Sequence, residues 1–141
     1  MPLRPPPNRI MVIDDSTVVR RIIEGILIRD GYLVDSFGHG PEAMKALSNH
    51  QTPVPDLVLL DIQLPYMDGY SVAKLFRQNR GLDQMNIVMI SGNDGMIDKV
   101  RWRMAGAKAY INKPFKPGEV LNVVHSILAA GERPVEEWEK V

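Results

Sequence analysis

Residues 57–61 read LVLLD, a run of four apolar residues that ends in an aspartate. Three other runs have the same form, IMVIDD at 10–15, IVMIS at 87–91 and AYINK at 109–113. Short apolar runs separated by longer stretches of helical period predict buried parallel strands in an α/β sheet. In such a sheet the carboxyl ends of the strands meet at one edge, where ligands bind. The polar residues that close these runs are therefore expected to converge there: Asp14, Asp15, Asp61, Ser91 and Lys113.

The segments between these runs predict amphipathic helices. Ser16 or Thr17 can cap the first helix and Gly31 can end it, while Pro41 suits the first turn of the second. Another strand is expected at 33–37, a third helix after Gly69, a fourth over 95–105 and a fifth over 117–130. The side chains expected to face inward from the first helix are Val19, Ile22, Ile23, Ile26 and Leu27, and from the fourth Ile97, Val100 and Met104.

Five pairs of strand and helix predict a doubly wound parallel sheet. Right-handed crossovers leave the flavodoxin-like (βα)5 arrangement, with strand order 2-1-3-4-5, as the simplest topology. Its switch point lies between strands one and three, where Asp15 and Asp61 stand. The binding site is therefore expected at these two residues.

The composition narrows the class of protein. The 141 residues are 45% hydrophobic, enough for one compact domain. Lys plus Arg and Asp plus Glu number 17 each, so no overall attraction to nucleic acid or to an acidic membrane is expected. The chain has no cysteine, which excludes disulfides and thiolate metal sites. Without a signal region or a long apolar stretch, a cytoplasmic protein is predicted.

Three segments are expected along the chain. Residues 1–8 contain four of the 11 prolines and predict an extended arm. Residues 9–130 form the domain. Residues 131–141 predict a polar, mainly acidic tail in which Trp138 is the one large apolar side chain.

The polar residues at the strand ends suit phosphate chemistry assisted by a metal ion. Neighbouring carboxylates repel one another, and Mg2+ bound through oxygen ligands is the usual relief, so Asp14, Asp15 and Asp61 predict a Mg2+ pocket. Lys113 and Ser91 supply the positive charge and the hydroxyl that phosphoryl oxygens require. A carboxylate in such a pocket can act as the nucleophile and form an acyl phosphate. Asp61 is the expected acceptor, because it stands alone while Asp14 and Asp15 are paired.

From about Arg9 to Ala130 the chain resembles the receiver domains of two-component response regulators. The resemblance rests on Asp14-Asp15, on DIQLPYMDG from Asp61, on Ser91 and on Lys113-Pro114-Phe115. It implies that Asp61 accepts the phosphoryl group, that Asp15 binds Mg2+ directly and Asp14 mostly through water. It also implies that the backbone carbonyl of Gln63 is a ligand and that Lys113 pairs with the phosphoryl group.

The resemblance further implies a switch that alters partner binding. Ser91 would move toward the phosphoryl group, and Tyr110 would turn inward. The partner surface would be the face formed by the fourth helix, the fifth strand and the fifth helix, where the sequence is basic and carries an aromatic residue. Its expected members are Lys99, Trp102, Arg103 and Lys108. Edge packing of Trp102 is an equally good interpretation.

The resemblance implies a sensor histidine kinase or a histidine phosphotransfer protein as donor and a protein as downstream target. The segment from Ser91 to Phe115 is similar to receivers of type IV pilus chemotaxis-like systems, which suggests pilus or motility machinery. The chain would not be an enzyme beyond its own phosphorylation and dephosphorylation, and would be a monomer or a phosphorylation-dependent dimer.

Other functions share part of this pattern. A haloacid dehalogenase-type phosphatase needs a second Asp two residues after the first, whereas Asp14 is followed by Asp15 and Ser16. A flavodoxin-like FMN binder would present hydroxyls and glycines in place of the acidic pair. A pseudo-receiver scaffold that is never phosphorylated and a receiver fragment of a larger regulator stay open as alternatives.

Overall fold

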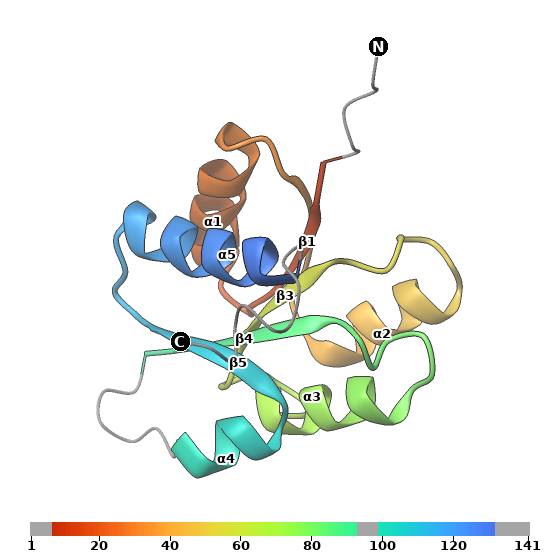
Figure 1. Ribbon diagram of the computed structural model, residues 1–141. Coiled ribbons are helices and arrows are strands. Elements are labelled where there is room, and N and C mark those ends of the chain that lie inside the picture. Colours follow the sequence, from red (N-terminus) through yellow and green to blue (C-terminus); the bar gives the residue numbers. More distant parts are fainter. Residues whose placement is uncertain (1–6, 93–98, 132–141) are drawn as a thin grey trace.

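The computed structural model describes residues 7–92 and 99–131. Strands and helices alternate strictly through these residues (Figure 1). The strands are β1 Arg9–Ile13, β2 Leu33–Phe37, β3 Leu57–Asp61, β4 Asn86–Ser91 and β5 Ala107–Asn112. The helices are α1 Thr17–Arg29, α2 Gly40–Ser48, α3 Gly69–Gln78, α4 Lys99–Met104 and α5 Pro117–Gly131.

The five strands form one parallel sheet in the order β2-β1-β3-β4-β5. This confirms the predicted topology. Helices α1 and α5 cover one face of the sheet, and α2, α3 and α4 cover the other (Figure 1). No helix among residues 7–92 and 99–131 is long and apolar enough to span a bilayer.

Alternation along the strands divides the core into two layers. Met11, Val58 and Met89 pack with α2 and α3, whereas Val12, Leu59 and Val88 pack with α1 and α5. Successive side chains of a strand point to opposite faces, so a strand covered on both faces is apolar throughout. All five residues of β3 are buried, which makes it the central strand that the LVLLD run predicted.

The helix ends follow local sequence. Ser16 caps α1 by accepting a hydrogen bond from the Val19 amide at 3.2 Å, as expected, and Gly31 follows the helix with a φ of +94°. Asp68 caps α3 through the Ser71 amide at 2.8 Å. His39 caps α2 through its Nδ1, a role that the sequence reasoning missed.

The predicted inward face of the fourth helix is wrong in the described part. Val100 and Met104 are 64% and 83% exposed, and Ile97 lies outside the described residues. Trp102 instead packs against the α2 and α3 layer of the core. Within Lys99–Met104 about one side chain per turn faces the sheet, and the largest apolar group occupies that place. Ile22 of α1, also predicted inward, is 50% exposed.

Arg77 joins three separate parts of the chain near the end of α3. Its guanidinium donates hydrogen bonds to the carbonyl oxygens of Asp83 at 2.6 Å, Met85 at 2.9 Å and Gly106 at 2.7 Å. Gly106 has a φ of +84°, and a Cβ there would lie 2.4 Å from Arg77 Nε. Glycine is therefore required at Gly106 both for its backbone conformation and for this close approach.

Candidate functional site

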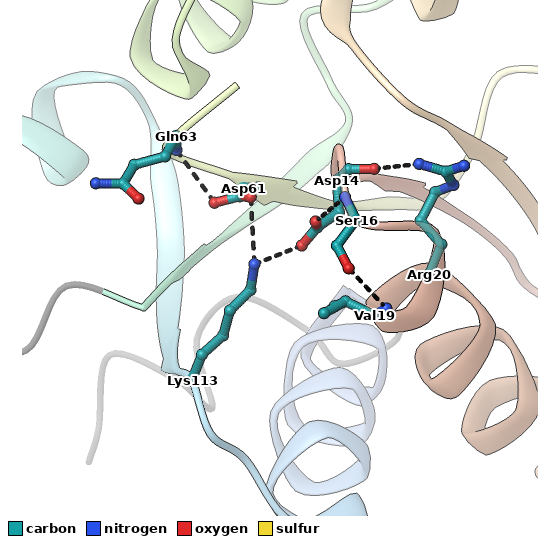
Figure 2. A network of polar contacts seen from close by, with 7 residues as sticks. All are labelled: Asp14, Ser16, Val19, Arg20, Asp61, Gln63 and Lys113. Atoms are coloured by element: carbon teal, nitrogen blue, oxygen red, sulfur yellow. Dashed lines mark hydrogen bonds and ion pairs between the residues drawn. The ribbon is translucent and has the colours of Figure 1, made fainter. Parts of the chain in front are cut away.

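The carboxyl ends of the strands bring the predicted polar residues to one edge, and Figure 2 shows Asp14, Asp61 and Lys113 there. Asp14 directly follows β1, Asp61 ends β3, Ser91 ends β4 and Lys113 directly follows β5. Asp61 pairs in register with Ile90, and Ser91 pairs with Asn112. This register places residues from four strand ends around the end of the central strand.

Three carboxylates form a cluster at this edge. One oxygen from each of Asp14, Asp15 and Asp61 lies within 4.8 Å of the other two. Asp14 and Asp61 are buried, whereas Asp15 is exposed to solvent. Oxygen ligands on a partly open pocket fit Mg2+, which keeps several waters and binds through one or two carboxylates. The donor set therefore suits the predicted metal ion.

Lys113 lies between the two buried carboxylates (Figure 2). Its Nζ is 2.7 Å from Asp14 Oδ2 and 3.2 Å from Asp61 Oδ2. The peptide bond between Lys113 and Pro114 is cis. The amide of Lys113 donates to the Ser91 carbonyl at 2.8 Å, which fixes the start of the side chain at the end of β4.

The pKa values at the site reflect burial and neighbouring charge. Burial of Asp61, followed by repulsion from Asp14, raises its pKa from 3.8 to about 6. The contact with Lys113 and the hydrogen bond from the Gln63 amide act in the opposite direction and are smaller. Burial lowers the pKa of Lys113, but hydrogen bonds and charge from Asp14 and Asp61 outweigh it, so that the pKa is raised.

Two backbone amides orient the carboxylates, and one unexpected side chain holds the backbone of Asp14. The Ser16 amide donates to Asp14 Oδ1 at 2.9 Å, and the Gln63 amide donates to Asp61 Oδ1 at 3.1 Å. Arg20 donates to the Asp14 carbonyl at 2.5 Å from one turn into α1 (Figure 2). Sequence reasoning missed Arg20, because it is separated from Asp14 along the chain and no short motif marks it.

The backbone beside Asp61 is tightly packed by the start of α3. A Cβ at Gly69 would lie 2.4 Å from the Asp61 carbonyl oxygen and 2.8 Å from Ile62 Cα. The Gly69 amide donates to the Ile62 carbonyl at 2.8 Å. The loop from Asp61 to Gly69 is therefore closed back onto the end of β3, and Gly69 supports the site by having no side chain.

Ser91 and Tyr110 lie on neighbouring strands beside the site. Ser91 is 2% exposed. Tyr110 is half-buried, packs against the α2 and α3 layer, and its hydroxyl donates to the side chain of Asn112. These positions suit the predicted switch residues, but their movement stays a prediction.

The expected partner face divides into exposed and packed side chains. Arg103 and Lys108 are exposed, and Lys99 is the first residue of α4. Trp102 is half-buried against the core, and its indole Nε1 has no hydrogen-bond partner within residues 7–92 and 99–131. Packing at the edge of the core therefore explains the position of the Trp102 side chain.

Comparison with known proteins gives the family. Residues 10–125 match the response regulator receiver domain. The chain is 32% identical to Protein PilG of Pseudomonas aeruginosa over 116 residues, which cover 82% of this chain and 84% of that protein. It is 37% identical to the alkaline phosphatase synthesis transcriptional regulatory protein PhoP of Bacillus subtilis over 125 residues, 89% of this chain but only 50% of that protein.

Solved structures give the same result. A putative response regulator from Chloroflexus aurantiacus superposes with a TM-score of 0.80 at 32% identity, over 87% of this chain and 98% of that one. The receiver domain of the sensor histidine kinase PA1611 from Pseudomonas aeruginosa has a magnesium ion coordinated in its active site cleft. It superposes with a TM-score of 0.73 at 27% identity, over 85% of this chain and 96% of that one. By sequence and by structure, the chain belongs to the response regulator receiver domain family.

Proposed function

We propose that this receiver domain is a phosphorylation-activated signalling switch whose acceptor is Asp61. The observation that carries this proposal is the position of Asp61 in the buried centre of the sheet edge, with Lys113 Nζ 3.2 Å from its Oδ2 and two further carboxylates beside it. The donor would be a phosphohistidine on a sensor kinase or on a histidine phosphotransfer protein.

The chemistry follows from the ionisation of Asp61. With a pKa near 6, Asp61 is mainly ionised at neutral pH and can act as the nucleophile. Its oxygen bonds to phosphorus as the phosphorus–nitrogen bond of the donor breaks, and the released imidazole takes up a proton. The product is an acyl phosphate, and Lys113 is placed to neutralise one of its oxygens.

The carboxylates of Asp14, Asp15 and Asp61, together with the backbone carbonyl of Gln63, would hold Mg2+. When bound, this ion supplies the positive charge that brings phosphoryl oxygens close to three carboxylates. Lys113 occupies the same acidic cluster, so without a metal ion its single charge offsets part of the charge of Asp14 and Asp61. Beyond self-phosphorylation from small donors and self-dephosphorylation, no enzymatic activity is proposed.

The response to phosphorylation would involve Ser91 and Tyr110. A phosphoryl group adds about −1.5 to −2 charges and three acceptor oxygens, which favours a state in which nearby donors turn toward it. Ser91 is buried one strand away from Asp61, and Tyr110 lies on the adjoining strand. The proposed output is altered binding of a protein to the α4, β5 and α5 face.

The downstream target of the switch is proposed to be a protein. The resemblance of residues 91–115 to receivers of type IV pilus chemotaxis-like systems supports a protein of the pilus or motility machinery as target. A cytoplasmic location, the absence of nucleic acid binding and the oligomeric state also stay predictions.

The first experiment is intact-mass measurement after incubation with acetyl phosphate. We expect a gain of one phosphoryl group in the presence of Mg2+, none in the presence of EDTA, and none in Asp61→Asn. A folded wild-type protein that gains no mass, and that also fails to bind beryllofluoride, would instead be a pseudo-receiver scaffold.

Lys113→Ala should uncouple phosphorylation from the switch. The variant keeps all three carboxylates, so Mg2+ binding should persist, but the phosphoryl group loses its cationic partner. We expect beryllofluoride with Mg2+ to change the NMR resonances of Tyr110 in the wild type and in the exposed control variant Lys116→Ala. The same change in Lys113→Ala would refute this role of Lys113.

A further inference from the structure

A basic groove with an apolar floor lies between α3 and α4, away from the carboxylate cluster. Its volume is about 380 Å3, and its walls come from Tyr70, Lys74, Arg77 and Gln78 on α3, from Arg101 and Met104 on α4, and from Ala105 directly after α4. Within their bounds, these two helices contain five basic residues and no acidic residue, although the whole chain has a net charge of zero.

The groove presents apolar and cationic side chains together. Met104 is 83% exposed and Val100, on the same helix, is 64% exposed. The Arg101 guanidinium lies 4.2 Å from the centre of the Tyr70 ring and 3.9 Å from an oxygen of Asp68. Large apolar side chains at this exposure beside cations mark a surface that suits an acidic segment with an apolar anchor.

The chain itself contains a segment of that chemistry directly after α5. Residues 132–141 read ERPVEEWEKV, with four glutamates, two basic residues and Trp138. Trp is the side chain most often found as an anchor in a pocket, and its ring also accepts cation–π contact from Arg. The segment thus complements the groove both in charge and in its one large apolar side chain.

Helix α5, which this segment follows, ends at the same edge of the sheet as α3 and α4, although it lies on the opposite face (Figure 1). Helices of a doubly wound sheet run back toward the amino ends of the strands, so the last turns of α3, α4 and α5 lie at the same edge (Figure 1). Leu128 of α5 shares a shallow pocket with Met85, and the Met85 carbonyl accepts a hydrogen bond from Arg77 in the groove wall. Trp138 follows Gly131 by seven residues, which reach about 23 Å when extended.

We propose that residues 132–141 dock in the groove between α3 and α4, with Trp138 against Met104 and Arg101. A short tether gives such a segment an effective concentration of about 1 mM, so modest complementarity is sufficient for occupancy. A partner recognised at this groove must then displace the segment. This inference does not depend on phosphorylation of Asp61.

The test uses the whole chain labelled at methionine methyl groups, without Mg2+ or a phosphoryl donor. We expect Trp138→Ala to move the Met104 methyl resonance, because the indole ring current is lost, and to leave those of the core residues Met11 and Met89 in place. Lys74→Glu together with Arg101→Glu should release the segment and bring the Trp138 indole resonance to its free-peptide position. The matched control Lys45→Glu, on α2 outside the groove, should not.

Three outcomes would overturn the proposal. The first is a Met104 resonance that is the same in wild type and Trp138→Ala. The second is a Trp138 indole that already resonates at the free-peptide position in the wild type. The third is loss of the Met104 displacement on dilution, because the occupant would then be the segment of another molecule. High salt should weaken the docking of the tethered segment, since its charges lie at the surface.

Discussion

Asp61 bears a charge that its surroundings disfavour in the absence of a metal ion. Its pKa is about 6 in the folded protein and 3.8 for an ordinary aspartate, chiefly because the carboxyl is buried. The folded chain therefore holds a proton on Asp61 that the unfolded chain releases at a lower pH. The resulting loss in the free energy of unfolding is absent below pH 4, grows as the pH rises to 6, and is complete above pH 6.

Asp61→Asn should consequently stabilise the metal-free protein at neutral pH. A difference of about two pKa units corresponds to a gain of up to about 3 kcal/mol in the free energy of unfolding at pH 7.5. Urea denaturation in EDTA at pH 7.5 and at pH 4 measures the gain at each pH, and we expect it to be much smaller at pH 4. An equal gain at both pH values would contradict the assigned ionisation.

At the scale of the element, the start of α3 requires glycine at position 69, because there is no space for a Cβ. Gly69→Ala would place a Cβ 2.4 Å from the Asp61 carbonyl oxygen, and backbone atoms cannot yield as a flexible side chain can. We expect a loss of about 1–3 kcal/mol in stability and slower phosphorylation from acetyl phosphate, since the end of β3 must shift. Gly118→Ala in the first turn of α5 meets open space and is the matched control.

Urea midpoints of the two variants test this difference. The control should be unchanged or stabilised by up to about 1 kcal/mol, because alanine favours helix more than glycine does. If both substitutions have the same effect, the close contact of Gly69 with β3 is not what limits the site.

The strands and helices differ in how much of their structure can be predicted from the sequence. The strands, the topology and the convergence of Asp14, Asp61 and Lys113 follow from apolar runs that each end in a polar residue, and the structure confirms them. The inward side of α4 could not be read in this way, because the apolar residues Val100 and Met104 predict one face and the larger Trp102 ring another. Trp102 is packed inward there by its size and not by its place in a repeat.

At the scale of the whole molecule, contacts from single arginine side chains to backbone carbonyls were beyond sequence reasoning. Arg20 reaches the Asp14 carbonyl, and Arg77 reaches carbonyls as far along the chain as Gly106. Arginine on a helix surface usually faces solvent, so only the assembled fold identifies these two as structural residues.

Arg77→Ala should destabilise the fold more than a surface arginine would. Three carbonyl oxygens, of Asp83, Met85 and Gly106, lose a charged donor at once. We expect a loss of about 2–4 kcal/mol, because hydrogen bonds to charged groups each contribute about 1.5–3 kcal/mol and water replaces part of them. Thermal or urea denaturation measures the loss, with exposed Arg80→Ala as control. A loss no larger than that of Arg80→Ala would mean that water substitutes fully for the guanidinium.

The Arg77 contacts also determine how α4 can move. Gly106, just beyond the last turn of α4, is held to α3 by the Arg77 hydrogen bond, which fixes this end of the helix. A helix that is held at one end moves by rotating about that end. A small displacement near Ser91 and Asp61 would swing the Lys99 end about a pivot at Gly106, and the largest change in surface would be found at the first turn of α4.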